Sequence, residues 1–168
     1  MTTAQHNLGE FVVRFQGLER GVNGLIKMLS RSDENIVDIL INDLEFSRRI
    51  KTLDVLYFYY VSVYTNNDEQ LAKNKHKEFH RFIVLLQRLA ERRNSLVHSK
   101  YTYWQDVTGS DGLIRNNYIL RGKDGEREEE DEELQPEAFD KDFTNLDEAS
   151  EKMEFHRSEI LDWQYPDE

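Results

Sequence analysis

The feature that most constrains the fold is the absence of proline before Pro136 in a chain of 168 residues. Proline breaks helices because it has no backbone N–H and its ring clashes with the preceding turn. Apolar residues recur at intervals of three and four along the first hundred residues, which is typical of amphipathic helices. We therefore expect three long helices, over about Leu8–Leu29, Glu34–Tyr64 and Glu69–Ser99.

Two of these helices contain segments that are unusual for an amphipathic helix. The first expected helix contains Gly17, Gly21 and Gly24, and glycine inside a helix costs roughly 1 kcal/mol against alanine. Such glycines more often mark a close approach of helices than a functional site. The second expected helix ends in Val55–Val61, which is apolar on all sides and rich in strand-forming residues. We interpret it as the buried half of a helix, with a strand as the alternative.

The helical pattern of the sequence ends at about Tyr101. A turn is expected at Gly109–Gly112, followed by a short strand or hairpin arm over Leu113–Arg121. Lys123–Glu133 is strongly acidic and typical of a mobile linker. A last helix is expected from about Leu146 to Trp163, where apolar residues again follow helical spacing.

Together these elements predict an all-α fold, a four-helix bundle with a small β-hairpin or irregular insert before the last helix. We expect a single domain over residues 1–168. Its parts are three long helices in 1–104, the insert and acidic linker in 105–142, and the final helix in 143–168.

Charge is divided unevenly along the chain. The net charge is −11, but residues 124–168 carry 19 acidic and 4 basic side chains, so residues 1–123 carry a net charge of +4. The segment from Leu71 to Tyr103 contains eight basic residues and only two acidic ones, Glu78 and Glu91. A solvated helix face and a nucleic-acid-binding surface both explain such a basic segment.

Several classes of protein are disfavoured. No apolar run approaches the roughly 18–20 residues that cross a bilayer, and the N-terminus lacks a signal-peptide pattern, so we expect a cytoplasmic protein with no membrane partner. The chain has no cysteine and matches no phosphate-loop, dinucleotide, hydrolase or zinc-protease motif. His76 and His80 could bind a metal from one helix face, but no third ligand is evident, so we expect no metal and no cofactor.

One group of residues has the chemistry of a catalytic site: Arg93-Asn94-Ser95-Leu96-Val97-His98, preceded by Arg92. His98 is the only one of the five histidines that follows an arginine after four to six intervening residues. Histidine titrates near neutrality and can accept or donate a proton, whereas arginine stays charged and matches phosphate oxygens. Asn94 lies four residues before His98, so on a continuous helix it would lie beside the imidazole and could orient it.

This segment resembles the motif of the HEPN superfamily, small helical domains of which many are ribonucleases with Arg, four to six residues, then His. The position toward the end of the third long helix is similar as well. The resemblance implies a metal-independent endoribonuclease that leaves 2′,3′-cyclic phosphate and 5′-OH ends, acting as a homodimer in a toxin or antiphage-defence setting. A possible antitoxin or regulatory protein is a further implied partner. The antitoxin-paired members carry a tyrosine two residues after the histidine, where this chain has Lys100.

The expected catalytic residues are Arg93, which would hold the phosphate, His98, which would do the acid–base work, and Asn94. Five residues at about 100° each separate Arg93 from His98 by about 140° on a straight helix. Either the helix loosens before His98, or two copies complete the site. Contacts to the RNA substrate are expected at the rim from Arg92, Lys100, Tyr101 and Tyr103.

Other interpretations remain open at this point. His98 could cap a helix end while Arg93 pairs in the core with Asp43 or Glu45. Lys100 and the aromatic residues 101–104 could serve packing alone. The acidic segment could be a solvating tail, or it could compete with RNA for the basic surface. The whole protein could be a non-catalytic helical dimer for protein interaction, or an RNA or nucleotide binder without turnover.

Overall fold

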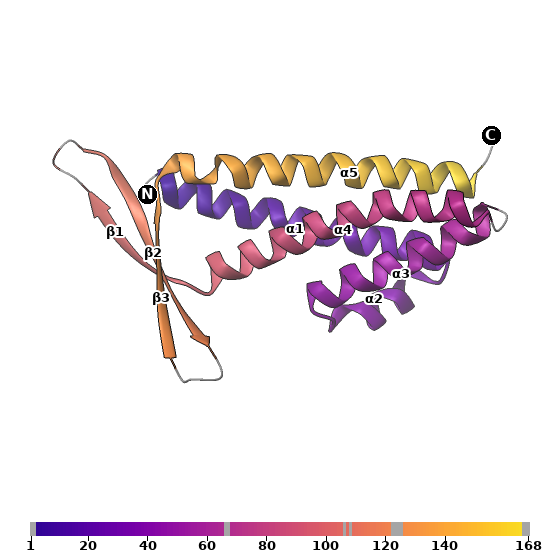
Figure 1. Cartoon of the computed structure of the whole chain (residues 1–168), viewed down its shortest axis with the longest axis horizontal. Coiled ribbons are helices and arrows are strands. Elements are labelled where there is room, and N and C mark those ends of the chain that lie inside the picture. The colour runs from indigo at the N-terminus through magenta and orange to yellow at the C-terminus, as the bar shows by residue number, and fades with distance from the viewer. Residues whose placement is uncertain (1–2, 66–67, 106, 108, 122–125, 166–168) are drawn as a thin grey trace. The chain divides into compact units, whose positions relative to one another are not determined.

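The computed structural model describes residues 3–65, 68–105, 107, 109–121 and 126–165. This part of the chain is mostly helical and contains five α-helices, one 3₁₀ turn and one antiparallel sheet (Figure 1). In chain order the elements are α1 (Thr3–Ser30), α2 (Glu34–Asn42), α3 (Phe46–Tyr64), α4 (Glu69–Val97), β1 (Lys100–Gln105), β2 (Asp111–Arg121), β3 (Glu126–Leu134), η1 (Pro136–Phe139) and α5 (Asp140–Gln164).

The helix expected over Glu34–Tyr64 is wrong as a single element, because the chain breaks between α2 and α3. Asp43 ends α2, and the backbone at Glu45 is extended, with a ψ of 148°. The carbonyl of Glu45 then accepts hydrogen bonds from Arg48 N and Arg49 N at 2.9 and 3.1 Å, which starts α3. Four helices rather than three therefore precede the sheet. The helical interpretation of Val55–Val61 is confirmed, but the expected burial is wrong for part of the segment, since Val55, Phe58 and Tyr59 are exposed.

The sheet is larger than the expected hairpin. Its strand order is β1-β2-β3 with antiparallel pairing, in which Arg115 of β2 lies opposite Tyr101 and Glu132. The strand expected over Leu113–Arg121 is confirmed within β2. The expectation of an acidic linker is wrong for residues 126–133, because they belong to strand β3. Residues 123–125 of the expected linker lie outside the described part of the chain. Alternate side chains of a strand share one face, and this pattern brings carboxylates toward Arg115.

The chain forms two compact units, each assembled from segments far apart in sequence. The motif unit consists of residues 1–15 and 91–146, and it contains the sheet and the end of α4. Its buried apolar side chains include Phe11, Leu96, Leu113, Leu134 and Phe139. The helical unit consists of residues 16–90 and 147–168.

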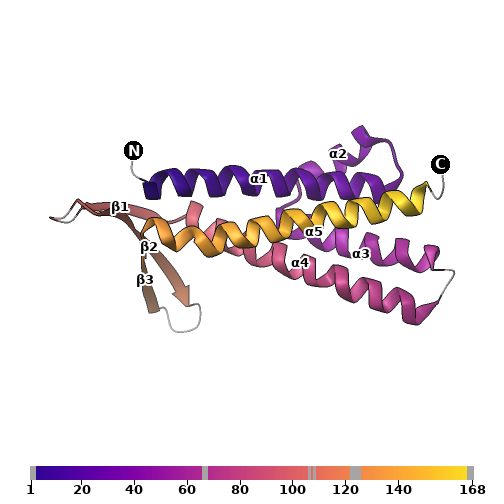
Figure 2. The same ribbon diagram turned by 90° about the horizontal axis from the view of Figure 1, so that it is seen from above.

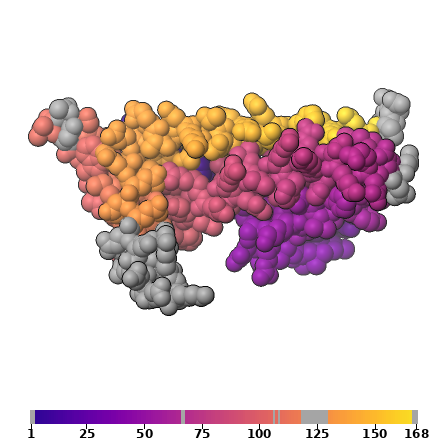
Figure 3. Space-filling model, viewed as in Figure 1, coloured from indigo at the N-terminus to yellow at the C-terminus, as the bar shows by residue number. Residues whose placement is uncertain are grey.

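The helical unit packs α2 and α3 with the corresponding parts of α1, α4 and α5 (Figures 2 and 3). Its core contains a stacked pair, Tyr57 and Phe79, with ring centroids 3.7 Å apart. The buried imidazole of His156 meets both rings edge-on. Buried aromatic groups of this kind supply much of the apolar area that stabilises a small bundle.

The expectation of close approach at the glycines of α1 is confirmed at one position. A Cβ at Gly21 would overlap the side chain of Met153 in α5. At Gly17 and Gly24 a Cβ would meet nothing within 4 Å among the described residues, so the expectation is wrong there.

Candidate functional site

The expected catalytic segment lies at the C-terminal end of α4. This helix ends at Val97, yet the N–H of His98 still donates to the carbonyl of Asn94 at 3.1 Å. The i to i−4 hydrogen bond shows that the backbone keeps helical geometry up to His98. The helix does not loosen before His98, so the side chains of Arg93 and His98 leave the axis about 140° apart.

Arg93 is partly exposed and has a neutral partner. Its Nη1 donates to Oδ1 of Asn94 at 3.1 Å. Among the described residues no carboxylate forms an ion pair with Arg93, so the core pairing with Asp43 or Glu45 is not observed. Because an amide does not neutralise a guanidinium, Arg93 keeps its full charge for an anionic ligand.

His98 is exposed and directly follows the last residue of α4. Within the described ranges its imidazole has no hydrogen-bond partner. Asn94, expected to orient His98, instead accepts a hydrogen bond from Arg93. One copy of the chain therefore brings together Arg93 and Asn94 and leaves the imidazole of His98 open to solvent.

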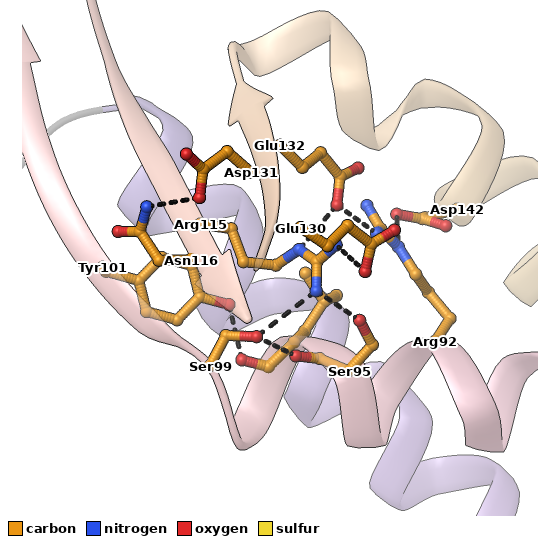
Figure 4. A network of polar contacts seen from close by, with 11 residues as sticks. Arg92, Ser95, Ser99, Tyr101, Arg115, Asn116, Glu130, Asp131, Glu132 and Asp142 are labelled. Carbon is orange, nitrogen blue, oxygen red and sulfur yellow. Dashed lines mark hydrogen bonds and ion pairs between the residues drawn. The ribbon is translucent and has the colours of Figure 1, made fainter. Parts of the chain in front are cut away.

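The neighbouring Arg92 has a different environment. Its Nη1 donates to Oε2 of Glu132 at 2.8 Å, and its Nε donates to Oδ2 of Asp142 at 2.9 Å (Figure 4). Burial alone would lower the pKa of this guanidinium, but its two carboxylate partners raise the pKa above the ordinary value. Arg92 was expected to contact RNA, and its guanidinium is turned to these two carboxylates.

Arg115 completes a network that sequence reasoning missed. Its side chain is only 3% exposed, and its Nε donates to Oε2 of Glu132 at 2.7 Å. It also forms an ion pair with Glu130 at 3.2 Å and donates to Oγ of Ser95 at 2.6 Å. The network thus joins the last turns of α4 to β2, β3 and the start of α5 (Figure 4).

The carboxylates of this network respond differently to their surroundings. Burial would raise the pKa of Glu132, but the hydrogen bonds and charges of its two arginine partners outweigh burial and lower it. Burial raises the pKa of Asp142, and the nearby Arg92 offsets only part of that effect. Glu132 is therefore the firmly ionised centre of the network.

The tyrosines expected at the RNA-binding rim lie in different environments. Tyr101 OH donates to the carbonyl of Leu96 at 2.5 Å, which satisfies a backbone acceptor in the last turn of α4. Burial raises the pKa of Tyr101. Tyr103 is exposed, with its hydroxyl 3.4 Å from Asp111. Lys100 is exposed at the start of β1.

A sequence signal for the missed network exists in part. Arg115 is a charged residue within an apolar, strand-like segment, and Glu130 and Glu132 have the two-residue spacing of one strand face. Their pairing depends on the register of β2 with β3, which no local pattern specifies. Asp142 belongs to a helix whose start was expected later, at about Leu146.

The fold and this site define a mostly helical protein with a small antiparallel sheet and a basic helix end. Comparison with protein-family models, with curated proteins and with solved structures finds no match for the chain. Among the described residues, none of the helices combines the length and the apolar character needed to span a membrane.

Proposed function

We propose that the chain is a metal-independent endoribonuclease of the HEPN type that acts as a homodimer. One observation carries the proposal: Arg93 and His98 lie at an exposed helix end with no acidic partner among the described residues. The two arginines beside them, Arg92 and Arg115, each have at least two carboxylate partners. This selective neutralisation leaves one guanidinium and one imidazole for a phosphodiester.

The chemistry needs no metal. A base accepts the proton of the ribose 2′-OH, the 2′-oxygen attacks phosphorus, and the 5′-oxygen leaves with a proton from an acid. His98 serves as the acid–base group, since an imidazole exchanges protons near neutral pH. Arg93 stabilises the charge that develops on the phosphoryl oxygens. The products carry a 2′,3′-cyclic phosphate and a 5′-OH.

The intact helix supports a site shared by two copies. Arg93 and His98 of one copy diverge by about 140°, so one phosphodiester cannot easily contact both. In a two-fold dimer, Arg93 of one copy can face His98 of the second. Val97, an apolar residue that is 43% exposed beside His98, is the kind of side chain that such contact would bury.

The remaining residues take supporting roles in the proposal. Arg92 and Tyr101 position the end of α4 through Glu132, Asp142 and the carbonyl of Leu96. Lys100 and Tyr103 would contact RNA at the rim, by charge and by base stacking. Asn94 orients Arg93 within one copy. The resemblance to HEPN domains is the sole basis for a toxin or antiphage setting with a regulatory protein partner.

The test is cleavage of total RNA and tRNA by the full-length protein in excess EDTA. We expect cleavage that leaves cyclic-phosphate ends, with at least a 100-fold loss in Arg93→Ala and in His98→Ala. Matched controls are Arg88→Ala, at an exposed arginine of the same helix, and His6→Ala, at an exposed histidine of α1. Cleavage that persists in both site variants, or that requires a metal, would contradict the proposal.

A second candidate is a non-catalytic helical interaction or RNA-binding module. The observation favouring it is an exposed apolar face on α2, formed by Ile36, Ile39 and Leu40. Such a face is typical of a surface that binds another protein. Wild-type protein that is folded and dimeric but leaves RNA intact would favour this candidate over the nuclease.

A further inference from the structure

A second polar cluster lies in the helical unit, where α3 runs beside the first part of α4 (Figure 2). His76 and His80 are four residues apart and project from one face of α4. Asp54 of α3 lies between them: Oδ1 is 3.0 Å from Nε2 of His76, and Oδ2 is 2.9 Å from Nδ1 of His80. The sequence showed the two histidines, and the packing of α3 on α4 supplies the third group.

The three side chains already have a geometry suited to an ion. One ligand atom from each of them lies within 4.8 Å of the other two. In a tetrahedral zinc site, bonds of about 2.0–2.1 Å place ligand atoms about 3.3 Å apart. The two contacts of Asp54 are close to that value but use different carboxylate oxygens, and the three ligand atoms lie within 4.8 Å of one another, so rotations of the side chains would close the site.

The surroundings hold the cluster while leaving it accessible. The side chain of Asp54 is 18% exposed and that of His76 is 30% exposed. The ring of His76 packs on Phe58, with centroids 4.7 Å apart. His80 is 52% exposed, so solvent reaches the site from its side and can occupy a fourth coordination position. Two anchored ligands and one adjustable ligand suit capture of an ion from solution.

We propose that Asp54, His76 and His80 bind a divalent transition-metal ion of the zinc class. Imidazole nitrogen favours Zn²⁺, Co²⁺ and Ni²⁺, whereas Mg²⁺ and Ca²⁺ prefer sites made of oxygen ligands. The carboxylate of Asp54 supplies one negative charge, and water completes the coordination. The ion replaces the two hydrogen bonds that Asp54 makes with the histidines.

A bound ion would link α3 to α4 and stabilise the helical unit. Any ligand that binds only the folded state raises stability by mass action. This role is separate from the proposed nuclease, whose residues belong to the motif unit and whose chemistry uses no metal. Removal of metal therefore lowers thermal stability without abolishing RNA cleavage, and the two proposals fail independently.

The experiment titrates ZnCl₂ into full-length, EDTA-treated and dialysed protein by calorimetry. We expect one high-affinity ion per chain, and a rise in Tm of roughly 5 °C or more at about 100 times Kd. Loss of an outer-shell partner of a metal site typically weakens binding about 10- to 100-fold, so loss of a direct ligand should cost at least tenfold. Asp54→Asn and His80→Gln are therefore expected to bind Zn²⁺ at least tenfold more weakly.

The matched control is His6→Gln, which removes an exposed histidine that contacts Glu10 at 3.8 Å. It should leave zinc affinity unchanged. Because the side chain of His80 is half-exposed, His80→Gln is the variant least prone to misfolding. The Tm of the metal-free variant checks that it is folded. Absence of zinc binding at millimolar concentration overturns the proposal. Binding that is equally tight in folded Asp54→Asn and His80→Gln also overturns it, because the ion then lies elsewhere.

Discussion

Arg92 and Arg115 share one acceptor atom, Oε2 of Glu132, at 2.8 and 2.7 Å. Two guanidinium groups this close repel one another unless carboxylates lie between and around them. Glu132 provides the shared charge, and Glu130 and Asp142 provide one each at the two ends. The carboxylates of strand β3 therefore balance the charges of Arg92 and Arg115, whereas Arg93 has only the neutral partner Asn94 within the described part of the chain.

Removal of one partner from the network should strongly destabilise the motif unit. Replacement of Arg115 by methionine removes a nearly buried charge and leaves Glu130 and Ser95 without that partner. We expect Arg115→Met to lower the free energy of unfolding by about 3–5 kcal/mol, measured by urea denaturation. Arg88→Met, at an exposed arginine of α4, should change it by less than about 0.5 kcal/mol. Equal effects of the two substitutions would contradict this expectation.

The helical unit should lose stability in acid through Glu159. Its carboxylate accepts hydrogen bonds from Tyr57 OH at 2.8 Å and Lys75 Nζ at 2.6 Å, and lies 3.3 Å from Nδ1 of His156. Burial alone would raise the pKa of Glu159, but these three neighbours lower it to about 2 from its usual 4.5. A lowered carboxyl pKa stabilises the fold above pH 4.5, and this contribution is lost as the pH falls toward 2.

Glu159→Gln should therefore destabilise the protein by about 2–3 kcal/mol at pH 7, and by about half as much at pH 3. Urea denaturation at the two pH values measures the difference. Glu154→Gln, at an exposed glutamate of α5, is the control. A destabilisation by Glu159→Gln that is the same at both pH values would contradict the assignment of its lowered pKa.

The three glycines of α1 should respond differently to alanine. Gly17→Ala and Gly24→Ala add a Cβ into open space and remove backbone freedom from the unfolded chain. Each should raise the free energy of unfolding by about 0.5–1 kcal/mol. At Gly21 the new Cβ meets the flexible end of the Met153 side chain, which must move aside, so Gly21→Ala should be less favourable than the other two by up to about 1 kcal/mol. Thermal and urea denaturation measure all three, and a larger gain for Gly21→Ala than for Gly17→Ala and Gly24→Ala would contradict the prediction.

Mixing of inactive copies tests the shared nuclease site. In a heterodimer of Arg93→Ala and His98→Ala chains, one site lacks both residues and the other retains both. Random exchange of equal amounts makes half the dimers heterodimers, so we expect about one quarter of wild-type cleavage to return. Mixed chains that stay inactive would contradict a site built from one residue of each copy. Exchange is checked with differently tagged chains.

Helix positions could largely be predicted from sequence, because they depend on local periodicity and on the absence of proline. The break between α2 and α3 was missed, since it depends on the backbone turn around Asp43 and Glu45 inside an otherwise helical pattern. The strand β3 was missed because eight of its residues are charged and resemble a solvated linker. Pairing with β2 brings Glu130 and Glu132 to Arg115.

The sequence by itself determined the helical character of the chain and the motif residues Arg93, Asn94 and His98, because both are short-range patterns along the chain. Only the tertiary structure decided which charges are neutralised. The register of β3 on β2 assigns Glu132 to Arg115, and the packing of α3 on α4 assigns Asp54 to two histidines. Such pairings depend on contacts between residues far apart in sequence, and composition and spacing do not encode which distant side chains meet.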